Sequence, residues 1–123
     1  MREIKFRVRN FETNKFEDLS NIIITIDGTG LEIYKNDGMV IDNYEINQYT
    51  NINDINGIEL YEGDIVKCRE CNITCKIIFS EGAMYMLEWN DNKWGNNEKH
   101  YYGLRAFTLE KVGDIYNNSD LLF

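Results

Sequence analysis

The feature that most constrains the fold is a two-residue alternation of apolar and polar side chains, interrupted at short intervals by glycine-containing turns. In residues 3–9 the apolar positions are Ile4, Phe6 and Val8, and charged residues such as Arg9 occupy the positions between them. This period is typical of a strand with one buried face and one solvated face. No stretch of the chain shows an extended helical period. The sequence therefore predicts a mainly β protein.

Residues 1–50 are interpreted as a small N-terminal β-sheet subdomain. The β-branched run at 21–26 is followed by the turn sequence DGTG at 27–30 and then by a second apolar run, which predicts a hairpin. The sequence NDG at 36–38 predicts another turn, and residues 44–49 alternate again. These short segments predict a compact sheet rather than a helical unit.

Residues 51–123 are interpreted as a small β-barrel of the Src-homology type. Brief strands are predicted at residues 58–61, 65–68, 73–79, 83–89 and 101–109, with a polar loop at 90–99. Closing such strands into a barrel would leave few backbone edges exposed. The polar residues 118–120, followed by three apolar residues, allow at most one short C-terminal helical turn.

The boundary between the two parts is expected in the turn-rich residues 51–57. The N-terminal sheet is expected to pack on the barrel, either as a separate subdomain or as part of one compact unit. A chain of 123 residues, with 43% hydrophobic residues, is long enough for one domain with a real core.

The charge of the chain limits its partners. The net charge is −8 and the pI is about 4.6, which argues against general nucleic-acid binding and against attraction to anionic membranes. The acidity is compatible with a basic protein partner. Residues 1–15 lack the apolar stretch of a secretory signal, so a cytoplasmic location is expected.

The three cysteines, Cys68, Cys71 and Cys75, lie close together and are odd in number, which favours reduced thiols over a disulfide framework. Together with His100, the only histidine, they would supply the four ligands of a zinc site. The spacing lacks the second C-x2-C pair of a zinc ribbon. Free cysteines are therefore favoured over zinc, and no metal or other cofactor is expected.

The sequence does not predict an active site. No nucleophile elbow or triad-like context surrounds Ser80 or His100. Glu59, Glu62 and Asp64 cluster around one turn, but Asp64 is placed to accept hydrogen bonds from that turn. The chain is therefore expected not to be an enzyme.

Aromatic and basic residues are concentrated in the second half of the chain, and they are the best candidates for contacts with a partner or a ligand. Exposed aromatic rings flanked by cations can stack on bases, although aromatic residues also dominate cores and interfaces. Trp94 is singled out because it lies in the polar loop. The candidate residues are Tyr85, Trp89, Lys93, Trp94, Lys99, His100, Tyr101, Tyr102 and Arg105.

Four sequence blocks resemble the YopX-like proteins of phages and prophages. They are MREIKFR at residues 1–7, QYTNINDINGIELYEGDIVK at 48–67, FSEGA at 79–83 and VGDIYNNSDLL at 112–122. Their order and spacing fit along nearly the whole chain. Two departures are Arg9, where the family usually has Trp, and the turn at 51–57, which lacks the usual lysines. The resemblance implies a β-rich, phage-encoded protein and is consistent with a homo-oligomer.

Two functions are expected from these observations. The first is a non-enzymatic phage or prophage accessory protein that binds a protein partner in the bacterial cytoplasm and assembles with itself. An inhibitor of a host nucleic-acid enzyme would be one such protein. The alternative is a protein that binds or sequesters a nucleotide in phage counter-defence, with a pocket formed by residues 85–105.

Overall fold

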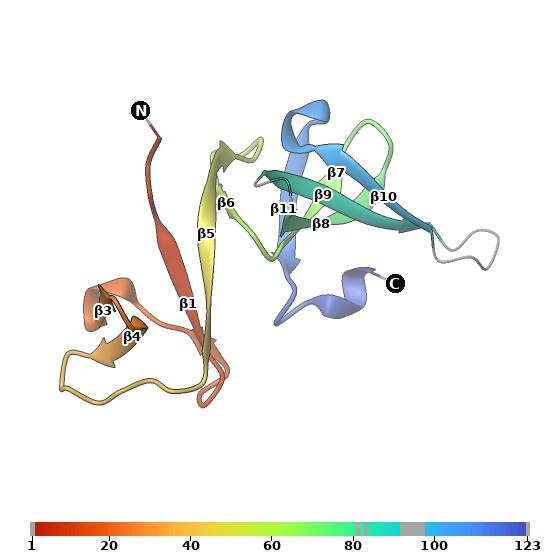
Figure 1. Cartoon of the computed structure of the whole chain (residues 1–123). Coiled ribbons are helices and arrows are strands. Elements are labelled where there is room, and N and C mark those ends of the chain that lie inside the picture. Colours follow the sequence, from red (N-terminus) through yellow and green to blue (C-terminus); the bar gives the residue numbers. More distant parts are fainter. Residues whose placement is uncertain (1, 81, 83, 92–97, 123) are drawn as a thin grey trace. The chain divides into compact units, whose positions relative to one another are not determined.

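The computed structural model describes residues 2–80, 82, 84–91 and 98–122 (Figure 1). Within these residues it is built of β-strands joined by turns and three short 3-10 segments, so the predicted mainly β fold is confirmed. The chain divides into two compact units. We call Lys5–Gln48 the N-terminal unit, and Met1–Ile4 together with Tyr49–Phe123 the C-terminal unit.

The N-terminal unit contains an antiparallel sheet and a separate hairpin. The sheet consists of β2 (Lys15–Phe16), β1 (Phe6–Asn10) and the first part of β5 (Tyr44–Asn53), in that order. The hairpin consists of β3 (Ile22–Asp27) and β4 (Gly30–Lys35), and the 3-10 turn η1 (Leu19–Asn21) precedes it.

The predicted turn at 27–30 closes the hairpin. The Asp27 carboxylate accepts hydrogen bonds from the backbone N–H and the hydroxyl of Thr29, at 2.7 and 2.6 Å. The left-handed backbone falls on Gly30, at φ 135°, as glycine allows. The second predicted turn is also present, because Gly38 has φ 89° and its N–H donates to the Lys35 carbonyl. The following apolar residues form only one isolated bridge, between Tyr34 and Val40.

The core of the N-terminal unit joins the sheet to the hairpin. Val8, Ile33 and Ile41 are buried, and Ile22, Ile24, Tyr44 and Ile46 pack against them. Two expectations for the first strand were wrong. Ile4 lies before β1 and is 68% exposed, and Arg9 is 5% exposed rather than solvated. The Arg9 guanidinium lies 5.1 Å from the centre of the Phe16 ring, and stacking of this kind accommodates a buried arginine.

The main sheet of the C-terminal unit has five strands in the order β10-β9-β8-β7-β11 and forms a half-barrel (Figure 1). Its strands are β7 (Asp64–Cys68), β8 (Ile73–Phe79), β9 (Tyr85–Asp91), β10 (Glu98–Gly103) and β11 (Leu109–Asp114). The end of β5 pairs separately with β6 (Glu59–Tyr61). Two 3-10 turns, η2 (Leu104–Ala106) and η3 (Ser119–Leu122), complete the unit. The second of these is the predicted C-terminal turn.

One apolar cluster fills the C-terminal unit. Its buried members are Leu60, Val66, Cys75, Ile77, Leu87, Leu104 and Leu109. Because they come from strands β6 to β9, from η2 and from β11, this core forms only when segments distant in sequence come together. None of the helical segments in the described part of the chain has the length and apolar character needed to cross a membrane.

Two predicted loops are shorter in the structure. β5 continues to Asn53, into the segment expected to be a turn, and a register shift between Tyr49 and Asn53 accompanies the positive φ of 65° at Asn51. β9 and β10 extend into the expected loop at 90–99, with Lys99 opposite Asn90. Polar side chains do not prevent this pairing, because backbone groups form the ladder and the side chains can stay in water.

Replacement of Gly113 by Ala should destabilise the C-terminal unit. A Cβ atom at this position would lie 2.5–2.7 Å from the Asn118 side chain, including its Cβ. The adjacent hydrogen bond from the Asp114 N–H to Asn118 Oδ1 limits how far that side chain can move. We expect the free energy of unfolding to fall by about 1–3 kcal/mol, as for other overpacked sites. Urea denaturation would measure the change.

Gly103→Ala is the matched control, since its Cβ would meet no atom within 4 Å and its φ of −66° suits alanine. It should leave the free energy of unfolding unchanged or raise it by up to about 1 kcal/mol. An equal decrease in the free energy of unfolding of Gly113→Ala and Gly103→Ala would contradict the steric explanation.

Candidate functional site

The structure separates the aromatic and basic residues that the sequence grouped together. Trp89 lies opposite His100, and Leu87 opposite Tyr102, in the β9–β10 ladder. Residues opposite each other share a face, and Leu87 is fully buried, so this face is directed toward the core. Trp89, Tyr102 and Tyr85 pack against that core as partly buried side chains. These rings therefore serve mainly as packing groups.

Ring contacts support this assignment. Trp89 and His100 are stacked, with ring centres 4.9 Å apart, and Tyr102 meets Phe107 edge-on at 5.2 Å. Tyr85 packs against Phe79 at 5.2 Å. Burial, together with the Glu62 charge, raises the pKa of Tyr85. His100 is therefore a stacked side chain of a strand rather than a free loop residue.

The other candidates lie elsewhere. Tyr101 and Lys99 alternate with the core-facing positions of β10 and are exposed, and Arg105 is an exposed residue of η2. Lys93 and Trp94 lie outside the described residues. The described candidates therefore occupy two faces of one hairpin and the turn that follows it, and they do not form a single binding surface.

The structure does not assemble the four zinc ligands. Cys68 and Cys75 are buried and Cys71 is exposed, with the Cys68 and Cys71 sulfurs 2.8 Å apart. His100 lies on β10, separated from the strand of Cys75 by β9, so the two backbones are roughly 10 Å apart. Among the described residues, no three His, Cys, Asp or Glu side chains are arranged to hold a metal ion.

The two buried thiols are also poor nucleophiles. Burial raises the pKa of Cys68 to about 11, assisted by its hydrogen bond with Cys71. Burial raises the pKa of Cys75 to about 12. Since the thiolate is the reactive form, both groups are almost entirely protonated near neutral pH.

Asp64 is a structural residue, as its position in the turn predicted. It is fully buried, and its Oδ2 accepts a hydrogen bond from the Tyr61 N–H at 2.8 Å. Its Oδ1 lies 3.3 Å from the Lys111 ammonium, a partner that the sequence did not reveal. Glu59 and Glu62 are only half-buried.

A shallow hollow of about 270 Å³ lies beside β11 in the C-terminal unit. Its walls include Ile52, Asp54, Arg105, Phe107 and Thr108. Arg105 and Phe107 bring a cation and an aromatic ring to its rim. Sequence reasoning selected Arg105 but missed the residues before position 60 that approach it.

Asp54, in the wall of this hollow, is 7% exposed and holds three backbone groups. Its Oδ1 accepts hydrogen bonds from Asn56 and Ile58, at 2.8 and 2.9 Å, and its Oδ2 accepts one from Lys111, at 2.9 Å. Burial opposes the charge on Asp54, but these donors and the Lys111 ammonium outweigh it, and the pKa of Asp54 lies below its ordinary value.

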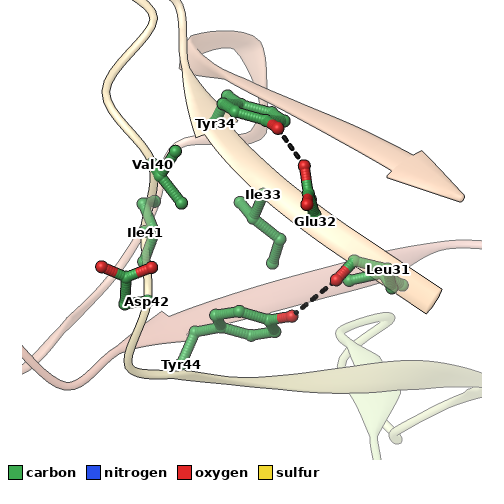
Figure 2. Close-up of a pocket in the computed structure, with 8 residues that line it drawn as sticks. All are labelled: Leu31, Glu32, Ile33, Tyr34, Val40, Ile41, Asp42 and Tyr44. Carbon is green, nitrogen blue, oxygen red and sulfur yellow. Dashed lines mark hydrogen bonds between the residues drawn. The ribbon is translucent and has the colours of Figure 1, made fainter. Parts of the chain in front are cut away.

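A second pocket, of about 230 Å³, lies in the N-terminal unit between β4 and residues 40–44 (Figure 2). Figure 2 shows Ile33 and the Tyr44 ring facing this space. The buried Ile33 and Ile41 contribute apolar surface. The eight lining residues are Leu31, Glu32, Ile33, Tyr34, Val40, Ile41, Asp42 and Tyr44.

Two tyrosine hydroxyls organise the rim of this pocket. The Tyr34 hydroxyl donates to the Glu32 carboxylate, and this hydrogen bond raises the pKa of Tyr34. The Tyr44 hydroxyl donates to the Leu31 carbonyl oxygen at 3.3 Å. Glu32 and Asp42, both exposed, are the charged groups among the eight lining residues, which include no Lys, Arg or His. The charged residues in the lining of this pocket are therefore both acidic, and its buried walls are apolar.

Sequence reasoning missed this pocket. Glu32 and Tyr34 could be placed on one face of a predicted strand from their spacing. Asp42 and Tyr44 lie beyond the turn at 36–38, and no periodic signal places them against that strand. The contact depends on the return of the chain, through the Ile41 N–H to Ile33 carbonyl hydrogen bond of 2.9 Å.

The fold and the two hollows define a small, mainly β protein with open surface pockets. The chain belongs to the YopX protein family, whose profile matches residues 5–123, so the family suggested by the sequence blocks is confirmed. No curated protein is similar enough to the chain to count as a match.

The chain is similar over almost its full length to a solved structure. The crystal structure of protein EF1440 from Enterococcus faecalis has a TM-score of 0.55 and 20% sequence identity to this chain. The similarity covers 98% of this chain and 99% of that one. At this identity the likeness shows a shared fold.

Replacement of Asp54 by Asn should reduce the free energy of unfolding by about 1–3 kcal/mol at pH 7, because an amide NH2 cannot accept a backbone hydrogen bond. The lowered pKa means that the carboxylate stabilises the fold above a pH of about 4, where the unfolded side chain is ionised. This contribution is lost as the pH falls through the lower folded-state pKa. The free energies of unfolding of the wild type and of Asp54→Asn, measured by denaturation from pH 7 to pH 3, should therefore converge as the pH falls.

Asp120→Asn, at an exposed position, is the control and should change the free energy of unfolding by less than about 0.5 kcal/mol. A difference between wild type and Asp54→Asn that stays constant down to pH 3 would show that the Asp54 charge has no stabilising role.

Proposed function

We propose that this chain is a non-enzymatic accessory protein of a bacteriophage or prophage. It acts in the host cytoplasm by binding a protein partner, and it also assembles with itself. The observation that carries the partner-binding proposal is the acidic, apolar-walled pocket of the N-terminal unit (Figure 2).

The size of the pocket supports recognition of a side chain. At about 230 Å³ it is smaller than the ~300–1,000 Å³ of typical small-molecule sites. It is also open to solvent on one side, because Val40 and Leu31 are 47% and 36% exposed. A site of this size suits one anchoring side chain of a larger partner.

The chemistry of the pocket favours an arginine or lysine as that anchor. Glu32 and Asp42 supply negative charge, and the hydrogen bond from Tyr34 helps to fix the Glu32 carboxylate. The Tyr44 ring offers a face for a guanidinium group, and the apolar wall suits the aliphatic part of the side chain. The net charge of −8 would attract a basic partner over a longer range.

A host enzyme that acts on nucleic acid fits this description, because its substrate-binding surface is rich in Arg and Lys. Occupying that surface with an acidic protein would inhibit the enzyme stoichiometrically. This mode of action needs no reacting groups.

We also propose that the C-terminal unit is a barrel of the Src-homology type, which would give the protein a rigid platform. Backbone contacts support closure beyond the five-stranded sheet. The Ile55 N–H donates to the Leu109 carbonyl oxygen at 3.0 Å, and the Asp54 carboxylate accepts from the Lys111 N–H. These contacts attach the segment after β5 to β11.

The double variant Glu32→Gln/Asp42→Asn tests the partner-binding proposal. Tagged protein would capture partners from nuclease-treated lysate of host cells, and the affinity would then be measured by calorimetry with the purified partner. We expect the variant to bind about tenfold more weakly, which corresponds to about 1.4 kcal/mol, because both rim charges are lost.

The control is Glu12→Gln/Glu45→Gln, which removes two exposed carboxylates from the same unit and changes the net charge equally. It should retain nearly full affinity at physiological salt. Equal weakening in both variants would indicate only general electrostatic attraction, and full affinity in the pocket variant would contradict the proposed site.

The second candidate function is nucleotide binding or sequestration, as in phage counter-defence. The hollow beside β11 supports it, because the exposed Arg105 could pair with a phosphate and Phe107 lies beside it. This hollow differs from the one the sequence suggested, since the rings of Tyr85, Trp89 and Tyr102 pack toward the core.

A thermal-shift panel of mono-, di- and cyclic nucleotides tests this candidate. A ligand at one hundred times its dissociation constant should stabilise the fold by about 2.7 kcal/mol. Arg105→Gln should abolish the shift, whereas Arg69→Gln, at another exposed cation of the same unit, should preserve it. If no nucleotide raises the melting temperature, this candidate is wrong.

A further inference from the structure

The β3–β4 hairpin leaves one edge of a strand unpaired. β3 pairs with β4, and within the described residues no other strand pairs with it. β4 is covered on its second side by the isolated bridge to Val40 and by the hydrogen bond from Ile41 to Ile33. The exposed backbone edge of the hairpin (Figure 1) is therefore that of β3.

The register identifies which backbone groups this edge presents. The Ile33 carbonyl oxygen accepts a hydrogen bond from the Ile41 N–H, and the Lys35 N–H donates one to the Met39 carbonyl oxygen. Both of these backbone groups therefore point away from β3. Their cross-strand partners are Ile24 and Ile22. In an antiparallel ladder, when the backbone N–H and C=O of one residue point outward, those of the residue directly opposite also point outward. Ile22, Ile24 and Ile26 therefore direct their N–H and C=O groups away from β4.

β3 lacks the features that usually protect an edge strand. Natural edges carry lysine, proline or a bulge, or are very short. β3 spans six residues, IIITID, with no Lys or Pro, and its register with β4 is unbroken. The side chains of Ile23 and Ile26 are 52% and 75% exposed. A two-stranded sheet is also marginally stable by itself and gains from a further strand.

We propose that the β3 edge pairs with the β3 edge of a second copy of this chain, in an antiparallel arrangement about a two-fold axis. This inference deepens, and rests on, the self-assembly part of the proposed function. It creates a four-stranded sheet in the order β4-β3-β3-β4.

The sequence of β3 is self-complementary in one register. Placing Ile24 opposite Ile24 of the second copy puts Ile22 opposite Ile26, so all the outward backbone groups of these residues can pair. The single charge of the strand, on Asp27, then lies opposite the neutral Asn21. The two Asp27 residues lie at opposite ends of the pairing. In a chain of net charge −8, this segment can therefore meet its own copy without opposing like charges.

Solution mass and amide hydrogen exchange of the full chain test the proposal. Sedimentation over a range of concentrations should show a dimer or a larger assembly built from it. In the assembled protein the amides of Ile22, Ile24 and Ile26 should be protected from exchange. After dilution to the monomer they should exchange quickly, while the inward amides of Ile23 and Thr25 stay protected in both states.

Ile26→Pro removes one outward N–H at a position whose side chain is exposed, so it should leave the pairing of β3 with β4 in place. It should raise the dissociation constant of the assembly at least tenfold. Ile26→Thr keeps the N–H and a β-branched side chain, so its dissociation constant for the assembly should stay within a few-fold of the wild-type value. If Ile26→Pro does not fold, Ile26→Lys supplies the same test by adding a charge to the edge.

Three results would overturn the proposal. One is a protein that stays monomeric at all accessible concentrations. Another is an assembly in which the outward amides exchange as fast as in the monomer, which would place the interface elsewhere. The third is protection of these amides only when a captured foreign protein is present. Because capture of a partner through Glu32 and Asp42 is measured separately, failure here is distinguishable from failure of the partner-binding proposal.

Discussion

The C-terminal unit depends on one lysine held by two buried carboxylates. The Asp54 carboxylate accepts a hydrogen bond from the Lys111 backbone N–H, and Asp64 pairs with the Lys111 ammonium at 3.3 Å. Buried carboxylates are costly unless they are paired and hydrogen-bonded, and each of these also accepts hydrogen bonds from turn backbone. The β-bulge of β11 lies immediately after Lys111. These contacts fix β11 beside β7 and bring the residues after β5 to the same place.

The N-terminal unit shows how an incomplete sheet leaves both a surface pocket and an unpaired strand edge. Its hairpin contributes Ile33 to a small core, and its β4 strand forms one wall of the acidic pocket. On the other side, β3 exposes backbone groups and isoleucine side chains. Both features arise because, among the described residues, neither strand of the hairpin pairs with a strand of the larger sheet. The proposed partner binding and self-assembly require correctly placed charges and an accessible strand edge.

Predictions from the sequence were most successful where local physics decides the structure. Asp27 and Gly38 marked real turns, because short polar side chains and glycine satisfy the backbone geometry there. Predictions about function were weaker. Trp89 and His100 were grouped with Lys99 as contact candidates, yet strand alternation directs the two rings toward the core and leaves Lys99 exposed. Spacing alone could not distinguish a core ring from a contact ring, because both faces of β10 contain aromatic residues.

The sequence by itself determined that the chain is mainly β, where most strands begin, and to which family it belongs. Alternation, turn chemistry and the order of the sequence blocks can all be read along the chain. Tertiary structure alone decided that Lys111 meets Asp54 and Asp64, that Asp42 and Tyr44 meet β4, and that β3 keeps an unpaired edge. The physical reason is that these contacts join residues far apart in the chain. Their partners are selected by strand order and register, which no local pattern encodes.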